Sequence, residues 1–255
     1  MRKTLTIFFM ILMSMNLSNA QTNETKMCAV HSIEVMKGYV SEKPYYLNNN
    51  LMLPLESVWN ILAKEECGGN FIAFAKPVFD LEDNTSPLKI NLNRNEFTLL
   101  PKIYHFEASD TIDGKIFISA DFFVKAYDCQ VFVDCNRQRV KVEDTYATCD
   151  VENAIAFIGK GSALRIKLKI DHEHEWKFNI SPLDGIDSPI VSLGSDTRHI
   201  TGYTGSLLSD SKDGYYEKDV YTFYYIYEFT VKEVGNYTIT AENGIDQYVY
   251  KITVF

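Results

Sequence analysis

The chain has 255 residues and a net charge of −9 at pH 7, with 34 Asp and Glu against 25 Lys and Arg. This acidic balance excludes a nucleic-acid-binding surface as the main function, because such surfaces cluster Lys and Arg to neutralise phosphates. The length suits two domains, and the composition changes near residue 147, beyond which helical patterns disappear. We therefore expect an α+β domain over residues 33–146 and an all-β domain over residues 147–255.

The first twenty residues have the pattern of a secretory signal peptide. Two basic residues precede an apolar run over residues 5–15, and Ser18–Ala20 forms a small-residue cleavage site. The run is shorter than the roughly 20 apolar residues that span a membrane, and no later segment is apolar enough to cross one. We expect an exported protein, secreted or held in the cell envelope, with residues 21–32 as a flexible tail.

An internal repeat organises the first predicted domain. The segment LMLPLESVWNIL, beginning at Leu51, returns in altered form as IFISADFFVKAY, beginning at Ile116, so that Glu56 matches Asp121. Each copy reads as a short strand followed by an amphipathic helix, over residues 55–62 and 120–127. We also expect a first strand over 32–40, a return strand over 71–74, strands over 88–92 and 96–100, a turn over 110–114 and a hairpin of 131–133 with 139–142. Repeated supersecondary units of this kind indicate a scaffold.

Short strands separated by turn residues fill the second half. The expected strands cover residues 154–158, 164–170, 174–180, 190–193, 221–231, 235–241 and 247–254. Seven short strands in about a hundred residues predict an antiparallel sandwich. The glycine-rich stretch over 194–219 is predicted to be a long loop. Strand alternation places Tyr221, Phe223, Tyr225 and Tyr227 on one face, either as sandwich core or as a binding face.

The first half resembles the copper amine oxidase N-terminal, or stalk, domain. The resemblance rests on LMLPLESVWNIL, KIFISADFF and QVFVDCNRQRVKV, and it covers residues 33–144. It implies a small antiparallel sheet packed on helices that acts as an accessory module, without copper and without catalysis. Ser119 replaces the second proline of the family pattern, and Asn236-Tyr237 is followed by Thr238 rather than by the acidic residue of the oxidase cofactor site.

The second half resembles the chagasin family of cysteine-protease inhibitors, which have an immunoglobulin-like sandwich. The resemblance rests on GKGSALRIKLKIDHEHEWKFNI and YTFYYIYEFTVKEVGNYTITAENG, and it covers residues 151–255. It implies a binding surface made of three loops. In this chain those loops depart from the family pattern, and their candidate partner-binding residues are Asp171, His172, Glu173, His174, Glu175, Gly202, Tyr203, Gly205, Asn243 and Gly244.

The segment Asp171–Glu175 is also the densest cluster of potential metal ligands. His172 and His174 lie two residues apart, so on a strand both imidazoles point to one side. A third ligand would have to come from elsewhere, for example from His199. The alternative interpretation is a solvated polar loop, because spacing alone does not establish coordination.

The five cysteines leave two interpretations open. An exported protein favours disulfides, but an odd count leaves at least one thiol unpaired, and a chain with no bridge at all is the alternative. No Gly-x-Ser-x-Gly, phosphate-loop or His-Glu-x-x-His motif occurs. The sequence therefore predicts a non-enzymatic binding or accessory protein without a cofactor, acting on a protein or cell-envelope partner. Inhibition of papain-like cysteine proteases is the alternative function, and metal binding through His172 and His174 is the third.

Overall fold

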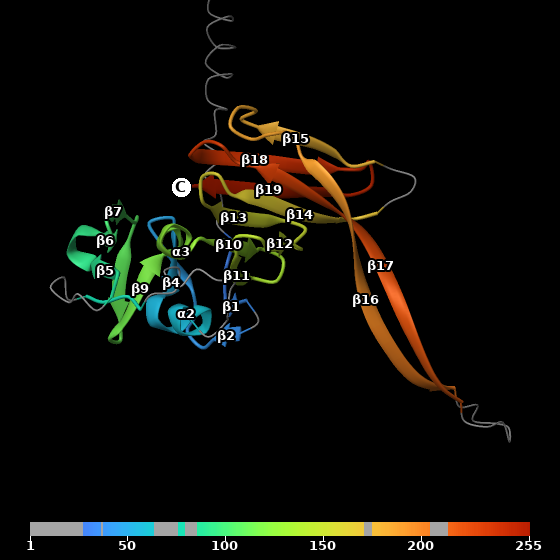
Figure 1. Ribbon diagram of the computed structural model, residues 1–255, viewed down its shortest axis with the longest axis horizontal. Coiled ribbons are helices and arrows are strands. Elements are labelled where there is room, and N and C mark those ends of the chain that lie inside the picture. The colour runs from blue at the N-terminus through green and yellow to red at the C-terminus, as the bar shows by residue number, and fades with distance from the viewer. Residues whose placement is uncertain (1–27, 37, 64–75, 80–85, 171–174, 205–213) are drawn as a thin grey trace, which may run out of the picture.

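A computed structural model of the chain describes residues 28–36, 38–63, 76–79, 86–170, 175–204 and 214–255 (Figure 1). For residues 199–204 and 214–218 it describes the backbone alone. The described chain is mostly β-structure, arranged in several sheets with two short α-helices. The predicted signal peptide and the predicted return strand over 71–74 lie outside the described residues. Within them, no helix has the length and apolar character that crossing a membrane requires.

The internal repeat is built as two similar units related by an approximate two-fold axis. The first unit contains β3 (Tyr45–Leu47), β4 (Asn50–Pro54) and α2 (Leu55–Leu62), and the second contains β8 (Ser109–Ile112), β9 (Lys115–Ser119) and α3 (Ala120–Tyr127). The strands form one sheet in the order β3-β4-β9-β8, in which β4 and β9 pair antiparallel with Leu53 opposite Ile118. These two residues are equivalent in the repeat, so the axis passes between them. Both predicted helices are confirmed.

The predicted turn over 110–114 is wrong at its start. Residues up to Ile112 are paired in β8, and only Asp113 and Gly114, both with positive φ, make the turn. The first predicted strand is likewise two strands, β1 (Ser32–Val35) and β2 (Gly38–Val40), which pair with each other. Met36 follows β1 with a φ of 51°, a left-handed conformation that ends an extended strand.

A three-stranded sheet packs against α3 through an aromatic contact. It consists of β5 (Leu88–Asn91), β6 (Glu96–Leu99) and β7 (Lys102–His105), with a 3-10 turn (Leu92–Arg94) between the first two strands. Phe97 on β6 packs edge-to-face on Phe122 of α3, with ring centroids 5.1 Å apart. The predicted strands over 88–92 and 96–100 are therefore confirmed to within a residue.

An eight-stranded sheet runs through both halves of the chain, in the order β15-β18-β19-β13-β10-β11-β1-β2. Its remaining strands are β10 (Cys129–Asp134), β11 (Arg139–Asp144), β13 (Ala154–Ile158), β15 (Lys177–Ser181), β18 (Gly235–Glu242) and β19 (Gln247–Val254). β13 pairs with β10 on one side and with β19 on the other, so the sheet continues across the predicted boundary at residue 147.

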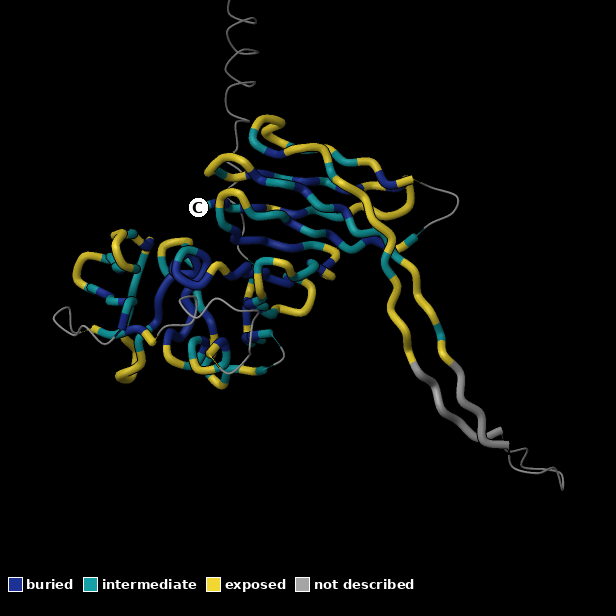
Figure 2. The backbone as a smooth tube through the Cα atoms, viewed as in Figure 1, coloured by how far each residue is buried: buried dark blue, intermediate teal, exposed yellow. Residues whose placement is uncertain are grey.

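The central strands β10 and β13 are buried (Figure 2), and their two faces serve two different hydrophobic cores. Val131 and Phe157 point into the core that contains both helices, whereas Phe132 and Ala156 point into the core of the second half. This division follows from the alternation of side chains along a strand. Both strands are buried along their whole length, as expected for the centre of a sheet covered on both sides.

A second sheet closes the core of the second half. It contains β12 (Thr148–Cys149), β14 (Ala163–Lys169), β17 (Gly214–Thr230) and β16 (Ile190–Thr204), in that order. The two sheets form the predicted β-sandwich, but the expectation of a wholly antiparallel sandwich is wrong, because β13 pairs with β19 and β12 with β14 in parallel. The predicted long loop over 194–219 is wrong for its described part, because residues 194–204 pair with 214–224 in a ribbon that projects from the sandwich (Figure 1).

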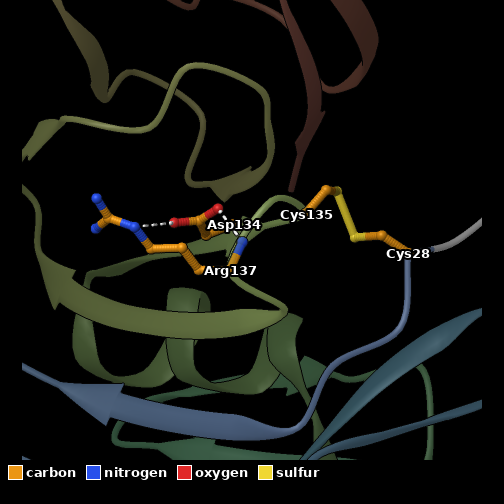
Figure 3. The surroundings of a disulfide bond; sticks show 4 residues. All are labelled: Cys28, Asp134, Cys135 and Arg137. Carbon is orange, nitrogen blue, oxygen red and sulfur yellow. Dashed lines mark hydrogen bonds and ion pairs between the residues drawn. A yellow bond between two sulfur atoms is a disulfide. The ribbon is translucent and has the colours of Figure 1, made fainter.

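One disulfide joins Cys28, just before β1, to Cys135, just after β10 (Figure 3). Their Cα atoms lie 5.4 Å apart although 107 residues separate them in sequence. The carboxylate of Asp134 accepts the backbone N–H of Arg137 at 2.9 Å, which fixes the turn that carries Cys135. Of the two interpretations of the cysteines, the one with a disulfide is therefore confirmed. Cys129 and Cys149 are buried thiols.

Candidate functional site

Trp176 fixes the base of the predicted loop 171–175 at one end of the sandwich. Its indole N–H donates to the carbonyl of Lys169 at 2.9 Å, which ties the end of β14 to the start of β15. Its ring stacks on Tyr248 of β19 with centroids 5.3 Å apart. Of the predicted loop, only Glu175 is described, and its side chain is exposed.

The turn between β18 and β19 lies at the same sandwich end. Lys177 at the start of β15 is paired with Glu242 at the end of β18, so the two connections are neighbours. The Asn243 side-chain oxygen accepts the backbone N–H groups of Ile245 and Asp246 at 3.0 and 2.7 Å. Gly244 supplies a φ of 87° that the turn requires. Asn243 is itself buried, and Ile245 is the apolar side chain that the turn presents to solvent.

The ribbon of β16 and β17 carries an exposed apolar surface, here called the ribbon strip. Val191, Leu193, Tyr221 and Phe223 are 50%, 65%, 56% and 54% exposed. The antiparallel register places Val191 opposite Tyr227 and Leu193 opposite Tyr225, so all of them share one face. The same face carries Tyr227 and Phe229 into the sandwich core.

The ribbon strip is therefore the core face of β17 continued beyond the sandwich. Along that face Phe229 and Tyr227 are buried, Tyr225 is half-buried, and Phe223 is exposed. The rings are in contact at the root, with Tyr225 and Tyr227 6.0 Å apart and Phe178 4.6 Å from Tyr227. Burial raises the pKa of Tyr227, and electrostatic interactions with Tyr225 and Glu175 raise it further.

The opposite face of the ribbon carries a cluster of polar side chains near its base. The ring of Tyr224 lies over Gly194, where an added Cβ would come within 2.3 Å of the ring. Lys167 lies over the same ring at 3.8 Å and forms an ion pair with Asp196, and the Tyr224 hydroxyl donates to that carboxylate at 3.2 Å. The hydrogen bond from Lys167 lowers the pKa of Asp196. One face of the ribbon is thus held by local contacts while the other offers apolar area.

The structure separates the predicted site residues into two groups. Glu175, Asn243 and Gly244 belong to the sandwich end. Gly202 and Tyr203 lie on β16, eight residues and more beyond Gly194, which is about 26 Å at roughly 3.3 Å per residue. The backbone of Gly202 is paired with Tyr216, so these two positions belong to the ribbon and not to the loop that was predicted. Asp171, His172, Glu173, His174 and Gly205 lie outside the described residues.

The structure does not test the predicted metal binding by His172 and His174. His172 and His174 lie outside the described residues, and His199 is paired through its backbone with Asp219 on the ribbon. Among the side chains that the structure describes, no group of three or more His, Cys, Asp or Glu is placed to hold a metal ion.

Sequence reasoning missed the residues that most define this surface. Ile245, Val191 and Leu193 carry no motif, and their exposure depends on where the sandwich ends. Alternation along β17 grouped Tyr221 and Phe223 with Tyr227, which is confirmed, but alternation alone does not distinguish the covered end of a strand from its uncovered end.

Comparison with known proteins gives few matches. No protein-family model matches the sequence, and no curated protein matches it. Among solved structures, the cysteine protease inhibitor EhICP2 from Entamoeba histolytica matches 40% of this chain and 84% of its own, at 11% identity and a TM-score of 0.23. Amebosin matches 41% of this chain and 90% of its own, at 16% identity and a TM-score of 0.21.

Proposed function

We propose that this protein is a non-enzymatic binding protein whose partner-binding surface consists of the sandwich end and the ribbon strip. The observation that carries the proposal is the continuation of the aromatic core face of β17 into solvent, together with Val191 and Leu193 of β16. Exposed apolar surface of this kind marks protein–protein interaction sites. Burying half-exposed side chains of this size contributes about 1 kcal/mol each.

The partner class that we propose first is a papain-like cysteine protease. The support is the resemblance of residues 151–255 to the chagasin family, together with the position of the start of β15 beside the β18–β19 turn. That turn is pre-organised by the two hydrogen bonds to Asn243 and by the positive φ of Gly244. Because a turn locked in this way loses little conformational entropy on binding, it suits an inhibitor that presents Ile245 to a cleft.

A second candidate is binding to a protein partner in the cell envelope, without inhibition. It is favoured by the ribbon, whose strand β16 continues for about 26 Å from Gly194 to Gly202, beyond the ribbon strip. A partner that contacts the whole ribbon would have to be broad, whereas a protease cleft would engage the sandwich end alone. The two candidates therefore differ in which variant weakens binding.

The test is inhibition of papain by the purified chain, with Ile245→Ser and Phe223→Ser as variants. Val234→Ser is the matched control, because Val234 is 62% exposed, close to the 69% of Ile245, but lies in the turn at the opposite end of β18. We expect Ile245→Ser to raise the inhibition constant at least tenfold, which corresponds to about 1.4 kcal/mol, and Val234→Ser to leave it unchanged.

Two results would count against protease inhibition. One is the absence of inhibition at high micromolar concentration, and the other is equal weakening by Val234→Ser and Ile245→Ser. In the first case the strip variants should be tested against envelope proteins instead, where loss of binding with Phe223→Ser is the result expected of the second candidate.

A further inference from the structure

A cavity of about 480 Å³ lies at the start of α2, far in sequence from the sandwich end. Its described lining includes Trp59, Val78, Phe79 and Ile116 as apolar groups and Glu56 and Lys76 as charged groups. Its volume lies in the range of about 300–1,000 Å³ that is typical of small-molecule sites. Trp59 is half-buried and Phe79 is 46% exposed, and both residues line the cavity.

Among the described residues, four charged side chains line the cavity: Lys115 and Glu42 form an ion pair, and Lys76 and Glu56 stand apart from it. Lys115 is bound to Glu42 at 2.6 Å, and this contact lowers the pKa of Glu42 to about 2. Lys76 lies 5.9 Å from the centroid of the Trp59 ring, and both Lys76 and Glu56 are exposed. Within the described part of the chain, neither Lys76 nor Glu56 has an oppositely charged side chain within ion-pair distance. The cavity thus offers one cation and one anion beside an aromatic wall.

The repeat shows what the same part of the helix does in the second unit. Val124 of α3 is the equivalent of Trp59, and it faces the turn at Gly159, where an added Cβ would lie 3.7 Å from Val124. The next residue, Lys125, lies over the ring of Phe255 at 5.0 Å. In the second unit this part of the helix is therefore covered from within the chain, by a turn and an aromatic ring. In the first unit it borders the cavity.

We propose that the cavity beside Trp59 binds a free aromatic amino acid. The ring of the ligand would lie between Trp59 and Phe79, its carboxylate beside Lys76 and its ammonium group beside Glu56. Paired aromatic rings and a cation close to an aromatic face each add about 0.5–1 kcal/mol or more to simple burial. A zwitterion satisfies both separate charges, whereas a ligand of one charge would leave one of them unmatched.

The test is titration of the full chain with L-phenylalanine, followed by fluorescence. The chain has two tryptophans, so Trp176→Phe leaves Trp59 as the reporter. For a ligand of this size we expect a Kd of about 0.1–1 mM. Three analogues each remove one group that the proposed site would bind. N-acetyl-phenylalanine lacks the ammonium group, phenylalanine amide lacks the carboxylate, and leucine lacks the aromatic ring. Each should bind about 5- to 10-fold more weakly than phenylalanine.

Two variants test whether Lys76 binds the carboxylate of the ligand and whether Glu56 binds its ammonium group. Lys76→Gln should weaken phenylalanine about 5- to 10-fold while leaving the amide unchanged, and Glu56→Gln should do the same for phenylalanine while leaving the N-acetyl form unchanged. Lys102→Gln is the control, since Lys102 is exposed on β7 and does not line the cavity, and it should change nothing. No binding up to 10-fold above the expected Kd range, or ring-dependent binding that ignores both variants, would overturn the proposal. None of these outcomes depends on the sandwich end, so they leave the proposed function untouched.

Discussion

Removal of the disulfide between Cys28 and Cys135 should lower the free energy of unfolding by about 4–5 kcal/mol. The bridge closes a loop of 107 residues that contains both repeat units and strand β10. In the chain-entropy account, a loop of about 100 residues restricts the unfolded chain by about 4.7 kcal/mol at 25 °C. That value is comparable with the whole stability of many domains, about 5–15 kcal/mol, so the loss should be easy to detect.

The assay is guanidinium denaturation of the wild type and of the double variant Cys28→Ser/Cys135→Ser, each with and without dithiothreitol. Dithiothreitol should shift the wild type to the midpoint of the double variant and leave the double variant unchanged, because the remaining described thiols, Cys129 and Cys149, are buried. A loss below about 1 kcal/mol would refute the reasoning, since it would mean that the unfolded chain gains little freedom when the bridge is absent. A stable bridge would also fit the predicted export of the chain to an oxidising compartment.

Three further predictions concern single side chains. Asp121→Ala should lower the free energy of unfolding by about 2–4 kcal/mol, measured by thermal unfolding. This fully buried carboxylate accepts the backbone N–H of Glu107 and forms an ion pair with Lys125. A loss under 1 kcal/mol would contradict the role of these bonds. Gly194→Val should lower stability by about 1–3 kcal/mol and disturb the ribbon, because a Cβ there clashes with the Tyr224 ring; an unchanged proteolysis rate in the ribbon would contradict the overlap. The pKa of Glu42 is lowered from 4.5 to about 2 by Lys115, so the pair stabilises the fold above pH 4.5 and loses that effect as the pH falls towards 2. Lys115→Gln should therefore cost about 1 kcal/mol at pH 6 and nothing near pH 2, with the lysine's exposure limiting the size; a pH-independent difference would contradict the assignment.

Local signals in the sequence predicted the helices and most strands correctly. The helix over 55–62 follows from Leu55, Val58 and Leu62 at helical spacing, and the structure buries these three side chains. The hairpin of β10 and β11 follows from alternating apolar residues on both sides of a polar turn. The repeat was visible as an offset in sequence, but the antiparallel pairing of Leu53 with Ile118 is a tertiary relation that the offset alone does not contain.

The main errors come from pairings between distant segments. Composition predicted a loop over 194–219, since glycine, serine and aspartate favour turns. The ribbon forms because residues 194–204 each pair with a residue of β17, as when Gly194 pairs with Tyr224 and lies beneath its ring. The partner of Cys135 was likewise unpredictable, because the parallel pairing of β1 with β11 brings Cys28 near it.

The candidate surface was predictable only in part. Its turn residues Asn243 and Gly244 were named from their sequence context, and the structure gives them a role in shaping the turn rather than in presenting area. The apolar area comes from Ile245 and the ribbon strip. The strip is exposed because β14 ends at Lys169, opposite Tyr224, and no longer covers β17 beyond that point. The sequence of β17 alone does not indicate where β14 ends.

The shared strands bear on the division into two domains. Phe132 of β10 belongs to the first half by sequence but is 1% exposed within the core of the second half. Next to it, Gln130 donates from its side-chain amide to the carbonyl of Ala163 on β14 at 3.0 Å. Phe132→Ala removes a buried ring and should cost about 3–5 kcal/mol. If the halves fold as one unit, that cost must lower the stability of both.

The two tryptophans report the halves separately. Trp59 alone, in a Trp176→Phe background, follows the first half, and Trp176 alone, in a Trp59→Phe background, follows the second. Phe132→Ala should shift the denaturation midpoint equally at both reporters, because β10 and β13 cannot leave one core without opening the other. A shift seen only at Trp176 would mean that the eight-stranded sheet parts between β10 and β13 at low cost. The boundary at residue 147 would then separate two folding units in spite of the hydrogen bonds that cross it.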